Sequence, residues 1–433
     1  MYLPYLLILL SQVSCILYSP EQVHISFGNS DSELFVTWTA QYKTPSSILQ
    51  YNLVKHDEDS FTNFSNTVQG TWRSFPNLNG TDVLQRTLYS CSAIMTNLIP
   101  GGFYKYRVGS DVYGWSKNFT LEAKKDHRSD HLARILVYGD FGINSETEFT
   151  IDALSSEVSD YKYDAIIHNG DFAYDLSSES GSTGDKFMNY IQKLASKIPY
   201  MVSQGNHEGN KNVLHYTNRF MMPGNSSNFY YSFNIGKAHF ISYSTEFIFE
   251  EKQQEQNAQM EFLINDLTSL DRTKYPWVVV FGHRPLYCSP DYSDHDDYTD
   301  FNYRKNKDCA QDSEKVRKVF EPIWYQYKVD LVIQAHVHSY ERLSAVYQNA
   351  SVPCQVEDIN QCKGAKAPVY IVTGAPGQSE SHAPVSQTPS AYSKMQDDSW
   401  GYSRLTVHNS THLLWEQVRS KTKKVSDTFW LIK

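Results

Sequence analysis

The chain has 433 residues, which is more than a typical single domain contains, so we expect at least two domains. Hydrophobic residues make up 40% of the chain and charged residues 20%, as in an ordinary globular protein. The formal net charge of −9 gives no support to a protein that binds nucleic acid or anionic membranes in general.

The N-terminus has the pattern of a cleaved secretory signal. An apolar run at residues 3–10 precedes small and polar residues, although no Lys or Arg comes before it. The run is too short to span a bilayer, which takes about 20 residues, and no later segment is long and apolar enough either. We expect a signal peptide at residues 1–17 and an extracellular or lysosomal destination, between which the sequence does not choose.

Sequons and cysteines agree with an oxidising compartment. Six N-x-Ser/Thr sequons lie along the chain, at Asn63, Asn79, Asn118, Asn225, Asn349 and Asn409. Once Cys15 leaves with the signal, two cysteine pairs each flank a polar loop: Cys288 with Cys309, and Cys354 with Cys362. We expect two loop-closing disulfides and a buried thiol at Cys91, with intermolecular pairing of Cys91 as the alternative.

The segment at residues 20–125 is rich in strand patterns. Apolar and polar residues alternate in LFVTWTA (34–40), SILQYNLV (47–54) and FYKYRVGS (103–110), and no helical pattern appears. We expect a β-sandwich of roughly 100 residues. The charged stretch EAKKDHRSDHLA (122–133) is a linker candidate, so we place a first domain at 18–126 and a second at 131–433.

Strands and helices alternate in the second domain. Apolar strands are expected at 133–140, 163–171, 199–208, 276–283, 329–336 and 367–374. Helices are expected at 146–158, 185–198, 253–270 and 314–327, and the third of them should bury Met260, Leu263, Ile264 and Leu267. Continuous apolar strands between helices predict an α/β fold with strands buried on both faces.

Side chains of the types that bind metals stand at the ends of these strands. They are Asp140, Asp171, Asn206, His283 and the pair His336 and His338. In open α/β sheets the functional crevice lies at the carboxyl ends of the strands, so these groups should meet. A carboxylate such as Asp171 can bridge two ions, and two ions about 3.5–4 Å apart are a common device for phosphoryl hydrolysis.

Five ordered blocks resemble those of the purple acid phosphatases, which are binuclear metallophosphoesterases. The blocks are GDFG (139–142), GDFAY (170–174), GNHE (205–208), VFGH (280–283) and AHVH (335–338). The β-rich first domain is similar to the fibronectin-III-like domain of the larger members, and WSKNFTLEA (115–123) and GYSRLTVHNSTHLLWEQV (401–418) match too. The resemblance therefore implies a fibronectin-III-like β-sandwich followed by a β-α-β metallophosphoesterase sandwich.

The resemblance also implies a role for each candidate residue. Asp140, Tyr174 and His338 would hold Fe(III), Asp171 would bridge, and Asn206, His283 and His336 would hold a divalent ion, which is zinc, iron or manganese in the family. His207 would bind phosphate or protonate the leaving oxygen. His295 is a second substrate-histidine candidate, although an exposed loop histidine is the simpler interpretation.

One block departs from the family pattern, because Ala335 stands where the family has Gly. The added methyl group is tolerated if the φ angle of Ala335 is negative and is strained if it is positive.

Three functions remain open. The first is a secreted acid phosphatase that hydrolyses phosphate monoesters by in-line attack of a hydroxide activated at the two metals. The second keeps the fold and acts on phosphodiesters, pyrophosphates or nucleotides, which the loops around the site would decide. The third is a binding protein with an inactive hydrolase domain, ranked last because all seven ligand candidates are present. A homodimer is compatible with the sequence, which does not fix the oligomeric state.

Overall fold

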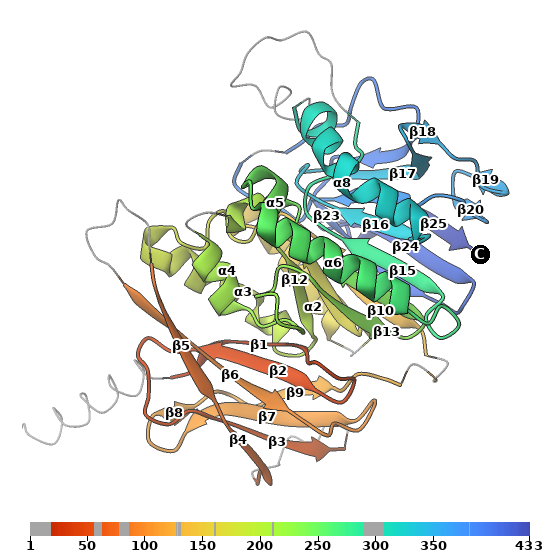
Figure 1. Cartoon of the computed structure of the whole chain (residues 1–433). Helices are drawn as coiled ribbons and strands as arrows, with labels where there is room; N and C mark the ends of the chain where they lie inside the picture. Colours follow the sequence, from red (N-terminus) through yellow and green to blue (C-terminus); the bar gives the residue numbers. More distant parts are fainter. Residues whose placement is uncertain are drawn as a thin grey trace, which may run out of the picture.

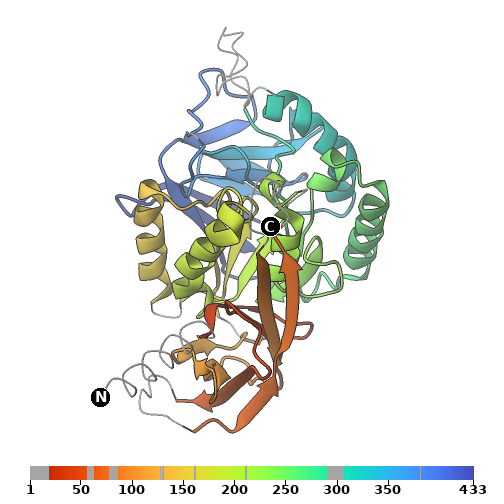
Figure 2. The ribbon, with the colours of Figure 1, turned by 90° about the vertical axis from the view of Figure 1, so that its left-hand side faces the viewer.

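The structure is a computed structural model that describes residues 19–433, apart from 56–62, 78–85, 127, 129–130, 160–161, 210–211, 290–306 and 381. Residues 1–17, Asn79 and His295 thus lie outside the described residues. Figures 1 and 2 show the N-terminal strands as a separate unit on one side of a larger layered α/β unit.

Two antiparallel sheets form the N-terminal unit, as the alternating sequence predicts. One has the order β1 (Glu21–Phe27), β2 (Leu34–Thr39), β6 (Thr87–Met95), β5 (Thr71–Pro76). The other has the order β4 (Asn66–Gln69), β3 (Ile48–Val54), β7 (Phe103–Ser110), β8 (Gly114–Trp115), with β9 (Phe119–Glu122) paired to β7.

The expectation for Cys91 is confirmed. Its thiol lies fully buried in the core of this unit and has no disulfide partner among the described residues. Burial raises the pKa of Cys91 to about 12, which makes the thiol a poor nucleophile.

Two larger sheets form the centre of the second unit. In the first, β10, β11 and β12 are parallel; its order is β12 (Tyr200–Ser203), β11 (Ala165–Asn169), β10 (Ala133–Tyr138), β23 (Gly401–Val407), β24 (His412–Arg419), β25 (Lys424–Ile432), β20 (Gln361–Lys363), β19 (Val356–Asp358). In the second, β14, β15, β16 and β21 are parallel; its order is β13 (Tyr231–Ile235), β14 (Ala238–Ser242), β15 (Trp277–Phe281), β16 (Leu331–Gln334), β21 (Val369–Thr373), β17 (Tyr340–Tyr347), β18 (Ala350–Ser351), with β22 (Ser393–Asp397) beside β17.

Helices cover the outer faces of the two sheets, so the layers run helix, sheet, sheet, helix (Figure 2). Side chains of α2 (Ser145–Val158) and α3 (Ser182–Ala195) share a core with the first sheet, and those of α6 (Gln253–Ser269) and α8 (Ser313–Gln326) with the second. On β15, Val278 and Val280 face these helices while Val279 faces the other sheet. Both faces of the strand are buried, which explains its unbroken apolar sequence.

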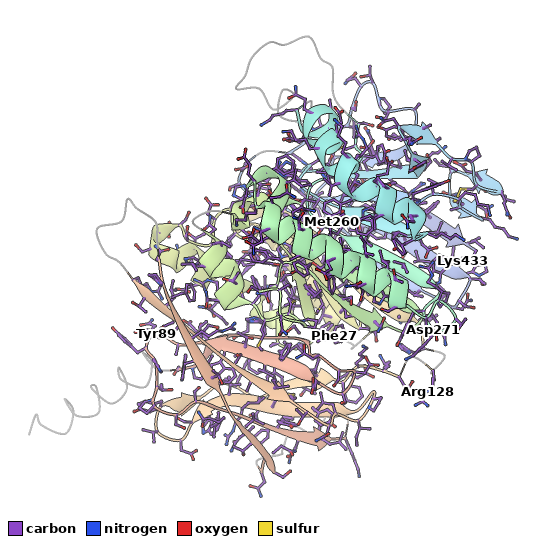
Figure 3. The ribbon with its side chains drawn as sticks, in the orientation of Figure 1. Phe27, Tyr89, Arg128, Met260, Asp271 and Lys433 are labelled. Atoms are coloured by element: carbon purple, nitrogen blue, oxygen red, sulfur yellow. A yellow bond between two sulfur atoms is a disulfide. The ribbon has the colours of Figure 1, made fainter. Side chains whose placement is uncertain are left out.

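The prediction for α6 was wrong in one position. Leu263 and Leu267 are buried, but Ile264 is 40% exposed and Met260 is half-buried. Figure 3 labels Met260 on this helix. The inner face continues through Gln259, whose side-chain amide exchanges hydrogen bonds with the backbone of Ser244, so a polar residue occupies an apolar-looking face. Two short helices, α4 (Val213–Arg219) and α5 (Glu246–Phe249), had no clear periodic signal in the sequence.

The two units are joined by polar contacts between β1 and the helices beside it. The guanidinium group of Arg219 donates to Asp185 at 2.9 Å and to the side chain of Gln22 at 3.0 Å. The backbone N–H of Val23 donates to the side chain of Gln192 at 2.7 Å. Arg219 is buried, so its pairing with Asp185 satisfies a charge that burial would otherwise penalise.

The two expected disulfides, Cys288–Cys309 and Cys354–Cys362, are present. The sequon asparagines that the structure describes, Asn63, Asn118, Asn225, Asn349 and Asn409, are exposed. None of the helices within the described ranges is long and apolar enough to cross a membrane.

Candidate metal centre

The candidate ligands lie where parallel strands of both sheets end. Asp140 follows β10, Asp171 follows β11, and Asn206 opens the short helix η2 (Asn206–Glu208) after β12. His283 follows β15, while His336 and His338 lie in the turn between β16 and β17. The carboxyl ends of the two sheets thus meet at one edge, which is where α/β folds place their functional crevice.

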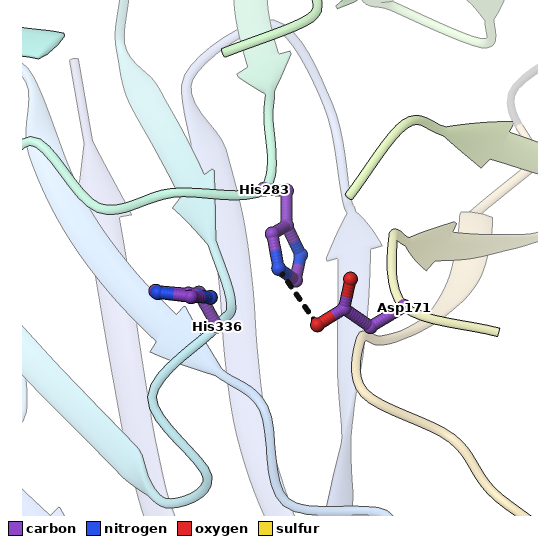
Figure 4. Close-up of side chains that lie close together, drawn as sticks. All are labelled: Asp171, His283 and His336. Atoms are coloured by element: carbon purple, nitrogen blue, oxygen red, sulfur yellow. Dashed lines mark ion pairs between the residues drawn. The ribbon is translucent and has the colours of Figure 1, made fainter. Parts of the chain in front are cut away.

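A first group of donor atoms gathers around His283. The ligand atoms of Asp171, His283 and His336 all lie within 4.8 Å of one another (Figure 4). Nε2 of His283 is 3.1 Å from Oδ2 of Asp171 and 3.1 Å from the side-chain oxygen of Asn206. Two bonds of about 2.1 Å to one ion place their donors roughly 3–3.5 Å apart, so this spacing suits a shared cation.

A second group lies beside it. The phenol oxygen of Tyr174 is 3.1 Å from Nε2 of His338 and 3.5 Å from Oδ1 of Asp140. Nε2 of His338 lies 3.6 Å from the same carboxylate oxygen, and that oxygen is 4.0 Å from Nε2 of His283. The two groups therefore adjoin, and the structure brings all seven residues singled out from the sequence to one place.

The charge of the site fits bound cations. Asp140 and Asp171 are almost fully buried, and the ion pairs they make within the described part of the chain are to histidines alone. Buried charges in proteins are either paired or bound to a metal, so two buried carboxylates among histidines are suited to bind cations. The mixture of carboxylate, imidazole, amide and phenol oxygen suits iron, zinc or manganese better than calcium.

The pKa shifts report the same excess of negative charge. Burial disfavours the charged form of His283, but the carboxylates of Asp171 and Asp140 raise its pKa to about 10. Burial, and then Asp140 and Asp171, raise the pKa of Tyr174 well above its usual value. The phenol would therefore keep its proton without a strongly attracting cation, and a ferric ion is such a cation.

The backbone carries unusual conformations at the ligands. Asp140, Asp171, Tyr174 and His336 have φ angles of 60°, 56°, 49° and 69°, in the left-handed region that such residues seldom adopt. Strained backbone of this kind gathers at functional sites. Ala335 is not among the positive-φ residues, so its methyl group is tolerated in place of the family's glycine.

Glu208 holds the turns that carry Asp171 and Asn206. Its buried carboxylate accepts hydrogen bonds from the backbone N–H groups of Asp171, Phe172 and Gly205 at 2.8–2.9 Å. Burial and the charge of Asp171 raise the pKa of Glu208 to about 8. Glu208 is part of the GNHE block, but nothing in the sequence distinguishes this supporting role from that of a ligand.

His207 lies at the edge of the site. Its Nδ1 is 2.8 Å from Asp175 and its Nε2 is 3.4 Å from Glu380 and 3.9 Å from Asp171. Burial lowers the pKa of His207, but Asp171, Asp175 and Glu380 together raise it to about 12. Cations beside Asp171 would lower it again, because they cancel the charge of that carboxylate.

A cavity of about 510 Å³ opens over the site. It is lined in part by residues that sequence reasoning missed, namely Phe249, Arg284, Asp308, Asp312, Lys315 and Glu380. Asp175, which contacts His207 rather than lining the cavity, was also missed, although it directly follows Tyr174. Of the lining residues, Phe249 ends α5, Asp308 and Asp312 lie on the helical turn η4 (Lys307–Asp312), Lys315 lies on α8, and Arg284 and Glu380 lie in loops. None of them belongs to a motif, and only the fold brings them here. The second histidine candidate, His295, lies outside the described residues.

Comparison with known proteins agrees with this geometry. The chain matches the purple acid phosphatase N-terminal domain over residues 20–123, calcineurin-like phosphoesterase over 133–340 and iron/zinc purple acid phosphatase-like protein C over 367–428. It is 36% identical to acid phosphatase type 7 of Danio rerio, over 96% of this chain and 91% of that protein. For acid phosphatase type 7 of Homo sapiens the identity is 35%, over 96% and 91%. The structure of a purple acid phosphatase from yellow lupin seeds (Lupinus luteus) superposes with a TM-score of 0.80, at 23% identity, over 96% of this chain and 74% of that one.

Proposed function

Because this chain belongs to the purple acid phosphatases, a family of acid phosphatases with a binuclear metal centre, we propose that it hydrolyses phosphate monoesters at acidic pH. The observation that carries the proposal is the convergence of seven donor side chains on one buried, carboxylate-rich site. The pair of ions would be Fe(III) with zinc, iron or manganese, and when bound it would supply a hydroxide for in-line attack and neutralise the phosphate charge.

The residues divide between two adjacent positions. Tyr174, Asp140 and His338 would hold the ferric ion, because a phenolate oxygen, formed when the ion displaces the phenol proton, and a carboxylate are hard, anionic donors. Asn206, His283 and His336 would hold the divalent ion. Asp171 would bridge, and Glu208 fixes the backbone from which Asp171 projects.

His207 is the proposed proton donor to the leaving oxygen. Asp175 lies 2.8 Å from Nδ1 and orients the ring, so that Nε2 faces the cavity. A histidine oriented in this way can donate a proton to an alkoxide as the P–O bond breaks. His295 stays a candidate for a second substrate histidine.

We further propose two domains, at 18–126 and 131–433, and a secreted or lysosomal glycoprotein after removal of residues 1–17. The exposure of Asn63, Asn118, Asn225, Asn349 and Asn409 supports the glycosylation, and the two disulfides support an oxidising compartment.

The test is metal analysis together with a substrate panel at about pH 5. We expect iron and one divalent ion per chain, a violet absorption band that is lost on strong reduction, and faster hydrolysis of a chromogenic phosphate monoester than of a diester, a pyrophosphate or a nucleotide. Preference for one of these other substrates would favour the second function. No turnover by protein that holds both ions would leave only the binding-protein hypothesis.

A further inference from the structure

The ring of His336 is held at its outer edge by residues that no motif predicts. Its Nε2 lies 3.4 Å from a carboxylate oxygen of Asp308 and 3.1 Å from Nη1 of Arg284. Figure 4 shows one ring nitrogen of His336 on the side of His283 and Asp171 and the other at the opposite edge. Since Nε2 meets Asp308 and Arg284, Nδ1 is the nitrogen that faces the group of ligand atoms.

The tautomer of His336 decides which neighbour it bonds. A ring that gives the Nδ1 lone pair to a cation carries its proton on Nε2. Nε2–H can then donate to the carboxylate of Asp308. It cannot form a hydrogen bond with Nη1 of Arg284, because both groups are donors. Arg284 has other partners, since its Nε lies 3.0 Å from both carboxylate oxygens of Glu246. A carboxylate that accepts the outer N–H of a metal-bound histidine fixes the ring and strengthens its hold on the ion.

The position of Asp308 depends on the neighbouring disulfide. Asp308 directly precedes Cys309, which is bonded to Cys288 five residues after His283. Both cysteines are buried and pack against Val337, the residue between the two histidines. One covalent link thus joins the segment that carries Asp308 to the loop after His283, and both ends of the link pack against the turn that carries His336.

We propose, building on the proposed metal centre, that Asp308 is a positioning residue that orients His336 toward the divalent ion, and that the Cys288–Cys309 disulfide keeps Asp308 in place. The disulfide therefore contributes to the affinity for the divalent ion. The ferric position does not use His336, and it should be affected much less.

The experiment measures metal retention in the full-length protein. Protein loaded with both ions is dialysed against increasing chelator, and iron and the divalent ion are counted by mass spectrometry. Asp308→Ala should lose the divalent ion at about 10–100-fold lower chelator than the wild type does. The iron content and the violet band should stay. Asp308→Asn should lose the divalent ion at a chelator concentration between those for Asp308→Ala and the wild type, because its amide oxygen can still accept a hydrogen bond from the N–H of His336.

Matched controls separate positioning from general damage. Glu314→Ala removes a carboxylate near the start of α8, where it pairs with Lys318 away from the residues that line the cavity, and should retain both ions like the wild type. Exchange of both Cys288 and Cys309 for Ser should weaken the binding of the divalent ion. The same exchange of Cys354 and Cys362 should leave that binding unchanged. The circular dichroism of each variant reports whether it is folded.

If folded Asp308→Ala retains the divalent ion as the wild type does, the positioning role is overturned, and equal loss of the ion in Glu314→Ala would overturn it too. If the wild type itself takes up no ion, the metal centre fails and the role of Asp308 fails with it, which is a different and recognisable result. Loss of the divalent ion in the Asp308 variant and in the Cys288/Cys309 variant, with iron kept, would support both steps.

Discussion

A buried histidine between the two units should make the protein less stable in acid. His24 lies on β1, is 2% exposed and contacts the carbonyl oxygen of Gln22 through Nδ1 at 2.8 Å. Its ring meets Phe220 edge-on at 5.6 Å between centroids. Burial, with smaller effects of Arg73 and Arg219, lowers the pKa of His24 from 6.5 to about 4.

The sign and size of the effect follow from proton binding. Below pH 6.5 the unfolded chain binds a proton at His24 that the folded protein refuses, so stability is full above this pH and falls as the pH falls toward the folded pKa near 4. Between about pH 7.5 and about pH 5 the unfolded state gains about 2 kcal/mol from this one residue. The loss lies in the pH range where an acid phosphatase works.

The variant His24→Asn keeps an N–H near the position of Nδ1 and cannot titrate. Urea unfolding followed by tryptophan fluorescence, at both pH values, gives the change in stability for each protein. We expect the wild type to lose about 2 kcal/mol more than the variant. His412→Asn, at the half-buried start of β24, should behave like the wild type. Equal losses in the wild type and His24→Asn would refute the reasoning, whatever the variant costs at pH 7.5.

Four further changes test the site and the core. Asp171→Asn should lower turnover at least about 100-fold and reduce the metal content, since it removes the proposed bridging charge; a fully loaded and active variant would contradict this. Tyr174→Phe should abolish the violet band in the visible spectrum and keep the divalent ion, and a band that survives would show that another residue binds the iron. Ala335→Gly should cost less than about 1 kcal/mol and leave metal affinity unchanged in a chelator titration. Trp324→Ala should cost about 3–5 kcal/mol in urea unfolding, because Trp324 is fully buried against Phe320 and Tyr243; a cost below 1 kcal/mol would mean that α8 is not part of the core.

The strand ends were predictable because two signals coincide there. Each buried strand is an apolar run, and the residue types change abruptly where it stops, as in VVVFG before His283. The parallel order then brings Asp140, Asp171 and His336 to one edge, although they lie far apart in the chain. The sequence pattern predicts where the strands and helices lie. The rule that α/β sheets place their functional crevice at the carboxyl ends of the strands then predicts that the ligand candidates meet.

Long-range polar contacts could not be predicted in the same way. Gln259 lies on the inner face of α6, where its side-chain amide exchanges hydrogen bonds with the backbone of Ser244, while the apolar Ile264 is exposed. Asp308 looks like any acidic residue beside a cysteine, and its contact with His336 depends on how two loops meet. Periodicity describes only the local chain, so residues recruited across the fold leave no periodic signal.

The left-handed residues connect the stability of the site to its chemistry. Each non-glycine residue in this region costs about 1–2 kcal/mol, and Asp140, Asp171 and His336 all adopt it two residues after a strand ends. The turns persist because hydrogen bonds hold them: Glu208 binds the N–H of Asp171, and Oδ2 of Asp140 accepts the N–H of His336 at 2.9 Å. The second bond means that one proposed ligand holds the backbone of another. The two proposed ion positions are therefore coupled through the protein backbone as well as through the proposed bridge Asp171. A change at Asp140 should disturb the divalent ion even though Asp140 is proposed to hold the ferric one.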